Sequence, residues 1–362
     1  MTVKISAKSA RISNKPVTIK DVAAEAGVTP GTVSKVLTAN NYNASATTSA
    51  KVRAAAKKLG YVPNSSASNL RNRRSGQIGI VLNEMDNSGR SMALQISGLQ
   101  MSSLEMVQIS FDGAVLAGLT GAIRRHKQGS FVIYPQPTNP NDDDMTRYMD
   151  RRVEGFVIRT DPRTPNRLLN ELDPSRVPMV ALWTQDVAPG VGYSDVDHVG
   201  GAKLAVRHLL ELGHTNIAYF GDGVGSGNTH FALRHTGYLE VLKNAGKPVF
   251  AVSDALQLRE LMKGKNRVTA VFAPTDLQAA VLAQDLMNLG VRIPDDISLV
   301  GFDDIFGSDF IAGGLTTVYH PVREMAEMAV DNLMALIRGE TVAKCRSIIS
   351  TRLIVRASTK PR

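Results

Sequence analysis

The chain has 362 residues, of which 43% are hydrophobic and 21% are charged, and this length suits two or three domains with separate cores. No run of about 18 apolar residues is present, and the N-terminus has no apolar stretch typical of a signal peptide, so we expect a cytoplasmic protein with no membrane partner. The single cysteine, Cys345, excludes an intrachain disulfide bond and a metal site built from several cysteines.

Positive charge is concentrated near the N-terminus. Residues 1–76 contain 13 Lys and Arg residues against two acidic residues, whereas residues 77–362 contain 29 basic and 31 acidic residues. A basic segment attached to a nearly neutral body indicates that the segment binds a polyanion and that the body has a different function. Residues 1–16 show no periodic pattern, and we expect a disordered basic tail there.

The basic segment continues as three short amphipathic helices. In the first, Thr18 is a helix-capping residue type, and apolar residues recur every three or four positions up to Gly27, which suits a helix C-terminus. The second helix begins with Pro30 after Thr29, because the missing N–H of proline costs nothing at the first helical position. A third helix is predicted over residues 47–59. Such a helix-turn-helix can place its second helix in the major groove of DNA.

The runs TIKDVAAEAGVTPGTVSKVL and KVRAAAKKLGYVPNSSASNLR resemble the headpiece and hinge of the LacI/GalR family of transcriptional regulators. The resemblance implies a DNA-binding headpiece over residues 17–62 and a hinge helix with its linker over residues 63–76. Leu70 matches the hinge leucine that such proteins insert into the minor groove at the operator centre, which kinks the duplex. From composition alone the hinge is a flexible linker, and we expect it to be disordered until DNA is bound. The residues expected to contact DNA are Thr18, Thr29, Pro30, Gly31, Thr32, Ser34, Lys35, Tyr42, Asn64, Ala67 and Leu70.

From residue 77 onward, β-rich runs alternate with amphipathic helical patterns, which predicts an α/β fold of doubly wound parallel sheets. The candidate strands are QIGIVL, SFVIY, EGFVI, PMVALW, NIAYFGD, VTAVFA and ISLVGFDD. The body also resembles the LacI/GalR family, whose bodies are similar to periplasmic sugar-binding proteins with two lobes around a ligand cleft. The resemblance implies a first lobe of about 77–196 and 303–320 and a second lobe of about 197–302 and 321–362.

The resemblance also implies an effector site. Arg234 matches the arginine of the family that binds the effector, and Asp276 is taken to match its aspartate. A guanidinium and a carboxylate can each bind neighbouring hydroxyls with paired hydrogen bonds, and an aromatic face can cover a sugar ring. Trp183 and Asp197, which lies near the first passage between the lobes, complete the expected site. Without the resemblance, Asp276 is a helix cap and Trp183 a core residue.

Other motifs give no catalytic or metal-binding signal. GDGVGSG at residues 221–227 follows a strand, but Ser226 stands where a nucleotide-binding loop needs glycine. The seven histidines lack HExxH or paired spacing, so we expect no metal site and no cofactor. Asp303 and Asp304 follow a strand and are interpreted as structuring a loop. No catalytic constellation is recognisable, and we expect no enzyme.

The sequence therefore predicts a homodimeric repressor that binds a pseudo-palindromic operator in double-stranded DNA and responds to a small molecule, a sugar or a sugar derivative. The alternative is a solute-binding or enzymatic α/β protein with an incidental basic N-terminal segment. That alternative predicts a signal peptide or a catalytic constellation, and the sequence shows neither.

Overall fold

The computed structural model describes residues 17–38, 44–61, 75–82, 101–133, 153–160, 169, 172–221 and 228–362, with the side chains of residues 101–110 left out. The chain divides into two compact units, Met1–Ser75 and Gly76–Arg362. The predicted basic tail and four predicted DNA contacts lie outside the described residues, namely Tyr42, Asn64, Ala67 and Leu70. Within the described part, no helix is both long and apolar enough to span a membrane.

The first unit contains three helices, α1 (Ile19–Ala26), α2 (Pro30–Thr38) and α3 (Ala46–Leu59). The Asp21 carboxylate accepts hydrogen bonds of 2.7 Å from both the backbone N–H and the hydroxyl of Thr18, and Gly27 ends α1 at a φ of 65°, where glycine is favoured. The buried side chains of the three helices form one small core: Val22, Ala23, Val33, Val36, Val52, Ala55 and Ala56. The predicted apolar stripes are confirmed, and α3 begins one residue before the predicted start.

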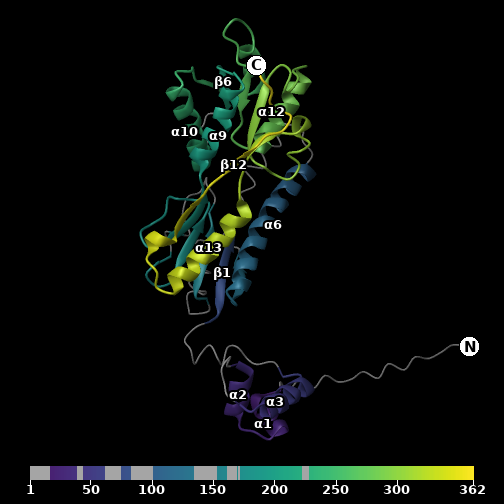
Figure 1. The fold of residues 1–362 in the computed structure, drawn as a ribbon, viewed down its shortest axis with the longest axis vertical. Helices are drawn as coiled ribbons and strands as arrows, with labels where there is room; N and C mark the ends of the chain where they lie inside the picture. The colour runs from purple at the N-terminus through teal and green to yellow at the C-terminus, as the bar shows by residue number, and fades with distance from the viewer. Residues whose placement is uncertain are drawn as a thin grey trace, which may run out of the picture. The chain divides into compact units, whose positions relative to one another are not determined.

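The first sheet of the second unit is parallel throughout, in the order β11-β5-β4-β3-β1-β2. Its strands are β1 (Gln77–Leu82), β2 (Gly129–Ile133), β3 (Gly155–Arg159), β4 (Met179–Leu182), β5 (Gly192–Val196) and β11 (Arg346–Ile349). The helices α6 (Met101–Arg125) and α13 (Val322–Ile337) lie side by side and bury a common core with the sheet (Figure 1). A Cβ on Gly118 would come within 2.7 Å of the Arg323 carbonyl oxygen, so this glycine permits the close approach of the two helices.

The second sheet has the order β12-β10-β9-β8-β6-β7, and only the pairing of β12 with β10 is antiparallel among its described pairs. Its strands are β6 (Ile217–Phe220), β7 (Phe250–Val252), β8 (Ala270–Phe272), β9 (Ser298–Asp303), β10 (Thr316–Tyr319) and β12 (Arg352–Ile354). Its helices are α9 (His198–Glu211), α10 (Thr229–Asn244), α11 (Ala255–Leu261) and α12 (Asp276–Asn288), and the short 3₁₀ segment η1 (Ile311–Gly313) lies between β9 and β10. The pair α9 and α10 shares one core with the sheet, and α11 and α12 share another.

We call the first sheet with α6 and α13 lobe 1, and the second sheet with α9 to α12 lobe 2. The first passage between the lobes follows β5. The predicted second passage after Phe302 is wrong, because β10 returns to pair with β9 in the second sheet, and residues 303–319 belong to lobe 2. The chain then crosses after Tyr319 to α13, the 3₁₀ segment η2 (Val342–Cys345) and β11 in lobe 1, and crosses again to β12. The predicted assignment of residues 321–362 to lobe 2 is therefore wrong for residues 322–349, which belong to lobe 1.

Candidate functional sites

The N-terminus of α2 carries few side-chain atoms. The Thr29 hydroxyl caps the helix, because its oxygen accepts a hydrogen bond of 3.3 Å from the backbone N–H of Thr32. Pro30 and Gly31 follow and are exposed. Apart from its two chain neighbours and the backbone of its own helix, the only described atom within 4 Å of a Cβ placed on Gly31 is the Thr29 hydroxyl, at 3.8 Å. This helix end can therefore approach another molecule closely and can also accept a larger side chain at Gly31.

The surface of the described headpiece is dominated by positive charge. Its exposed basic residues are Lys20, Lys35, Lys51, Arg53, Lys57 and Lys58. The acidic residues in the same part are Asp21 and Glu25, and Glu25 pairs with Lys58 at 2.7 Å. Among the predicted DNA contacts, Thr18 and Lys35 are exposed like Thr29, Pro30 and Gly31, whereas Thr32 and Ser34 are half-buried. A basic surface around an open helix N-terminus suits an anionic polymer.

In lobe 2, Arg234 holds a fixed position in α10 with only 2% of its surface exposed. Its Nη2 donates to Asp303 Oδ1 at 3.0 Å, its Nε donates to His198 Nδ1 at 3.3 Å, and its Nη1 donates to the carbonyl oxygen of Pro274. The guanidinium carbon also lies 3.7 Å from the centre of the Phe302 ring. These contacts hold a positive charge beside the end of β9.

A chain of hydrogen bonds runs from Asp303 to Trp183 in lobe 1. Trp183 Nε1 donates to His320 Nε2 at 3.3 Å, so Nε2 is an acceptor and Nδ1, which lies 3.4 Å from Asp303 Oδ1, is the donor of this ring. Burial raises the pKa of Asp303, but the charge of Arg234 and the hydrogen bond from His320 outweigh burial and hold this pKa below its usual value. An ionised carboxylate is thus linked to lobe 1 through His320.

Trp183 is buried among side chains of lobe 1. Its ring stacks on Phe111 with centroids 4.8 Å apart and planes 9° apart, and the Arg159 guanidinium lies 4.7 Å from its centre. Its φ of 67° is rare for a bulky residue, and Asp303 has a φ of 116°. Backbone strain of this kind is concentrated at functional sites, and here both strained residues belong to the same hydrogen-bonded chain.

Asp276 is fully buried and binds other parts of lobe 2. Its Oδ2 accepts from the Ile305 N–H at 3.0 Å and the Ser308 hydroxyl at 2.7 Å, and its Oδ1 accepts from the Thr317 hydroxyl. Burial and the neighbouring Asp303 charge raise the pKa of Asp276 to about 7. Both carboxylate oxygens of Asp276 therefore bind the segment that follows β9. The carboxylate that contacts Arg234 is that of Asp303, which sequence analysis assigned to loop structure.

The helix caps also differ from the expectation. Thr275, and not Asp276, caps α12, because the Thr275 hydroxyl accepts from the N–H of Gln278 at 3.1 Å. Asp197 caps α9 by accepting from the N–H of Gly200 at 2.7 Å, and its own N–H donates to the Ile349 carbonyl oxygen of β11 at 2.9 Å. Asp197 thus fixes a passage between the lobes, and its expected contact with an effector stays a prediction.

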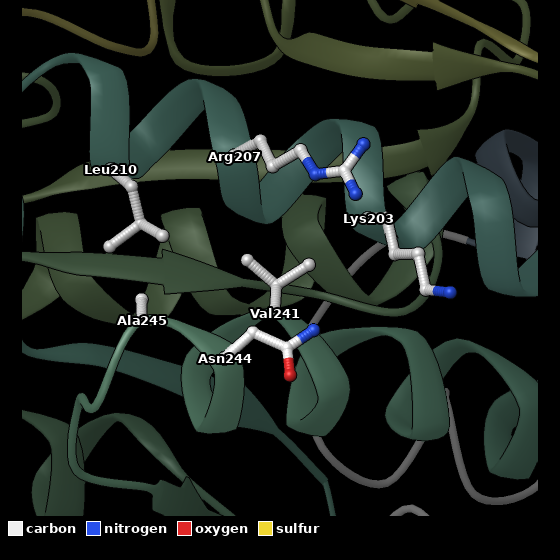
Figure 2. Close-up of a pocket in the computed structure, with 6 residues that line it drawn as sticks. All are labelled: Lys203, Arg207, Leu210, Val241, Asn244 and Ala245. Carbon is white, nitrogen blue, oxygen red and sulfur yellow. The ribbon is translucent and has the colours of Figure 1, made fainter.

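A hollow of about 260 Å³ lies between α9 and α10, outside the hydrogen-bonded chain (Figure 2). Its lining residues are Lys203, Arg207, Leu210, Val241, Asn244 and Ala245. It contains no aromatic residue, and its Lys203 is paired with Glu240 at 2.6 Å. This hollow lacks the stacking surface and the carboxylate that a sugar site uses.

Two family models match the chain: Bacterial regulatory proteins, lacI family, over residues 18–64, and Periplasmic binding protein-like domain, over residues 206–359. The HTH-type transcriptional regulator CelR of Thermobifida fusca is 30% identical over 365 aligned positions, covering 94% of this chain and 98% of CelR. The ribose operon repressor of Escherichia coli (strain K12) is 29% identical over 355 positions, covering 94% of this chain and 99% of that repressor.

Solved structures agree with these matches. A complex of the transcriptional regulator CelR with cellobiose has a TM-score of 0.61 and 27% identity, and the match covers 94% of this chain and 99% of that one. The lac repressor dimer bound to operator and an anti-inducer has a TM-score of 0.70 at 23% identity, covers 96% of this chain and 100% of that one, and shares the fold. The chain therefore belongs to the lacI family of bacterial regulatory proteins.

Proposed function

We propose that this regulator acts in the cytoplasm as a homodimeric repressor whose α2 helices read the two halves of a pseudo-palindromic operator. The observation that carries this proposal is the exposed N-terminus of α2, at Thr29, Pro30 and Gly31, with the exposed Lys35 one turn further on, on a headpiece with a basic surface. Lysines around the helix neutralise phosphates, while the open helix end reaches base edges in the major groove. The hinge residue Leu70 remains the expected minor-groove wedge.

The effector that we propose is a sugar or a sugar derivative, bound beside Arg234 and Asp303. Among the described residues, no group donates to Asp303 Oδ2, so this oxygen can accept from a sugar hydroxyl while Oδ1 stays paired with Arg234 and His320. Trp183, at the other end of the chain of hydrogen bonds, supplies an aromatic surface. The CelR structure with cellobiose supports a sugar as the class of effector.

An effector bound at this position would change the arrangement of the two lobes. Trp183 belongs to lobe 1, Asp303 belongs to lobe 2, and His320, which joins them, lies on a passage between the two. A ligand that replaces one of these hydrogen bonds favours a different arrangement of the lobes. The resulting shift in population would change the fraction of dimers that can bind the operator.

The function can be tested by selecting bound DNA from a random pool with the full-length protein, followed by a panel of sugars and sugar phosphates added to the selected complex. We expect a pseudo-palindromic consensus and a change in operator affinity with one class of sugar. Lys35→Ala should weaken the consensus, whereas Lys263→Ala, a control in lobe 2, should leave it intact. A protein that enriches no sequence would contradict the proposal.

A further inference from the structure

A second cluster of polar side chains lies buried where the lobes meet. Asp195 belongs to β5 of lobe 1, His198 begins α9, and His230 lies in α10 of lobe 2. The three residues are 1%, 1% and 8% exposed. One potential ligand atom from each lies within 4.8 Å of the other two. Three elements thus bring together a carboxylate and two imidazoles, which the spacing of histidines in the sequence did not reveal.

Two atoms of this cluster lack the partners that buried polar atoms normally have. Among the described residues, Asp195 Oδ1 and His198 Nε2 have no hydrogen-bond partner, although they lie 3.3 Å apart, because their alignment does not form a hydrogen bond. A buried polar atom without a partner is destabilising, because it has lost its hydrogen bonds to water and gained none in exchange. Two ligands of a tetrahedral zinc ion, each about 2.0–2.1 Å from it, are separated by about the same 3.3 Å. The unsatisfied pair therefore has the spacing of two metal ligands.

The neighbouring contacts of two ligands, His230 and Asp195, are of the kind that metal ligands make with their second polar atom. His230 Nε2 donates to the Trp183 carbonyl oxygen at 2.9 Å, which leaves the lone pair of Nδ1 available. Gln185 Nε2 donates to Asp195 Oδ2 at 3.0 Å, which leaves Oδ1 for a cation.

We propose that Asp195 Oδ1, His198 Nε2 and His230 Nδ1 bind one divalent transition-metal ion, with Zn²⁺ the best match, and that this ion fastens lobe 1 to lobe 2. Imidazole nitrogens favour Zn²⁺ over Mg²⁺ and Ca²⁺, which prefer oxygen ligands. Three protein ligands leave a fourth position for water. Gln185 is exposed and contacts Asp195, so the site lies one side chain below the surface.

Metal binding requires two local changes. The His198 and His230 rings are stacked, with centroids 4.3 Å and planes 25° apart, whereas a bound ion lies in the plane of each ring, so at least one ring must turn. His198 must also carry its proton on Nδ1, which removes the acceptor of the Arg234 Nε hydrogen bond. Metal binding is therefore coupled to Arg234. Arg234 also belongs to the proposed effector site, so the expectation that metal binding affects the effector rests on the proposed function, whereas the metal site itself does not.

The test uses full-length protein treated with a chelator, in the absence of DNA and sugar. A negative result would then contradict the metal site and would leave the proposed function untouched. Zn²⁺ affinity is measured by competition with a chromophoric chelator, and Co²⁺ serves as a spectroscopic probe. We expect one Zn²⁺ per chain and the intense visible absorption of four- or five-coordinate Co²⁺. His230→Gln and Asp195→Asn should each reduce Zn²⁺ affinity by more than about 100-fold.

Two further variants make the test independent of folding. Gln185→Ala changes an exposed residue that only orients Asp195, and it should reduce Zn²⁺ affinity about 10-fold. His208→Gln, on α9 but outside the cluster, should leave affinity unchanged. The proposal is overturned if wild-type protein binds no stoichiometric Zn²⁺, or if Gln185→Ala and His230→Gln bind it as tightly as wild type, because the ion then lies elsewhere.

Discussion

Arg234 in α10 and Asp303 at the end of β9 form a buried ion pair, with Nη2 3.0 Å from Oδ1 and side chains 3% and 14% exposed. Removing either charge leaves the other buried without its partner, which typically costs 3–5 kcal/mol, roughly a third of the stability of a domain. A buried pair of this kind is weak evidence for stability, and the strained backbone of Asp303 itself and of Trp183, which follows β4, supports a role in binding.

Asp303→Asn should weaken the response to sugar. The amide keeps the size of the side chain but loses the charge that accepts hydrogen bonds from hydroxyls, and a hydrogen bond to a charged group is worth about 1.5–3 kcal/mol. We expect the sugar concentration that shifts operator binding to rise by about 10–100-fold, measured by fluorescence anisotropy of labelled operator. Asp304→Asn, which removes a contact with Arg356 instead, is the control. Equal sugar responses of wild type and Asp303→Asn would remove Asp303 from the site.

The stability of the protein should depend on the titration of Asp276. Its pKa is 3.8 when unfolded and about 7 when folded, because burial and Asp303 disfavour the charge, so the native state binds more protons between these values. The contribution of Asp276 is fully present below about pH 4 and is lost as the pH rises to about 7, over a total of a few kcal/mol.

Urea unfolding of wild type and Asp276→Asn at several pH values checks this sign. The asparagine does not titrate, so the difference in free energy of unfolding, wild type minus variant, should fall from about pH 4 to about pH 7 and then stay constant. A difference that rises with pH over this range would show that Asp276 is ionised in the native state at low pH.

The headpiece could be predicted from sequence because its determinants are local. Capping residues, the proline after Thr29 and the apolar stripes all lie within one turn of the helices that they specify. The strand β10 was missed because TTVY is short and its burial depends on pairing with β9 and β12, which are distant in the chain. Because β10 was missed, residues 303–320 were assigned to lobe 1, although β10 pairs with β9 in lobe 2.

The body site could be predicted only in part. Arg234 was identified, but Asp276 and Asp303 lie at the ends of neighbouring strands. Sequence alone does not show that the Asp276 carboxylate accepts hydrogen bonds from Ser308 and Thr317, whereas the Asp303 carboxylate accepts one from Arg234. The cluster of Asp195, His198 and His230 was invisible because its three residues come from three elements. Spacing along the chain reveals a metal site when one helix carries several ligands, and that is not the case here.

Trp183 should report sugar binding directly. It is the only tryptophan in the chain, and its ring stacks on Phe111 and donates to His320. A sugar that enters this chain of contacts should change the intensity or wavelength of tryptophan emission at the same concentrations that change operator affinity. Trp183→Phe should lose the optical signal. A sugar that alters operator binding while leaving the emission of wild type unchanged would place the effector elsewhere.

Base preference should depend on the residues that follow Thr29. Pro30 offers no hydrogen-bonding side chain and Gly31 none at all, and each missing bidentate base contact forfeits about 1–3 kcal/mol of discrimination. We expect Gly31→Gln to add or change preference at one or two base pairs per half-site and Lys35→Ala to relax preference at another, as read by selection from a random pool. Strong wild-type preference at the pairs facing Gly31, unchanged in Gly31→Gln, would contradict this docking of α2.

The dependence of operator affinity on salt, measured for the full-length protein and for residues 77–362, tests most directly whether the headpiece binds DNA. A protein that neutralises several phosphates releases their counterions, so full-length affinity should fall by about 10³-fold or more between about 50 and 200 mM salt. Residues 77–362, whose charged residues nearly balance, should form a dimer that does not bind the operator at any salt concentration. Salt-independent binding by the full-length protein, or operator binding by residues 77–362, would contradict the account.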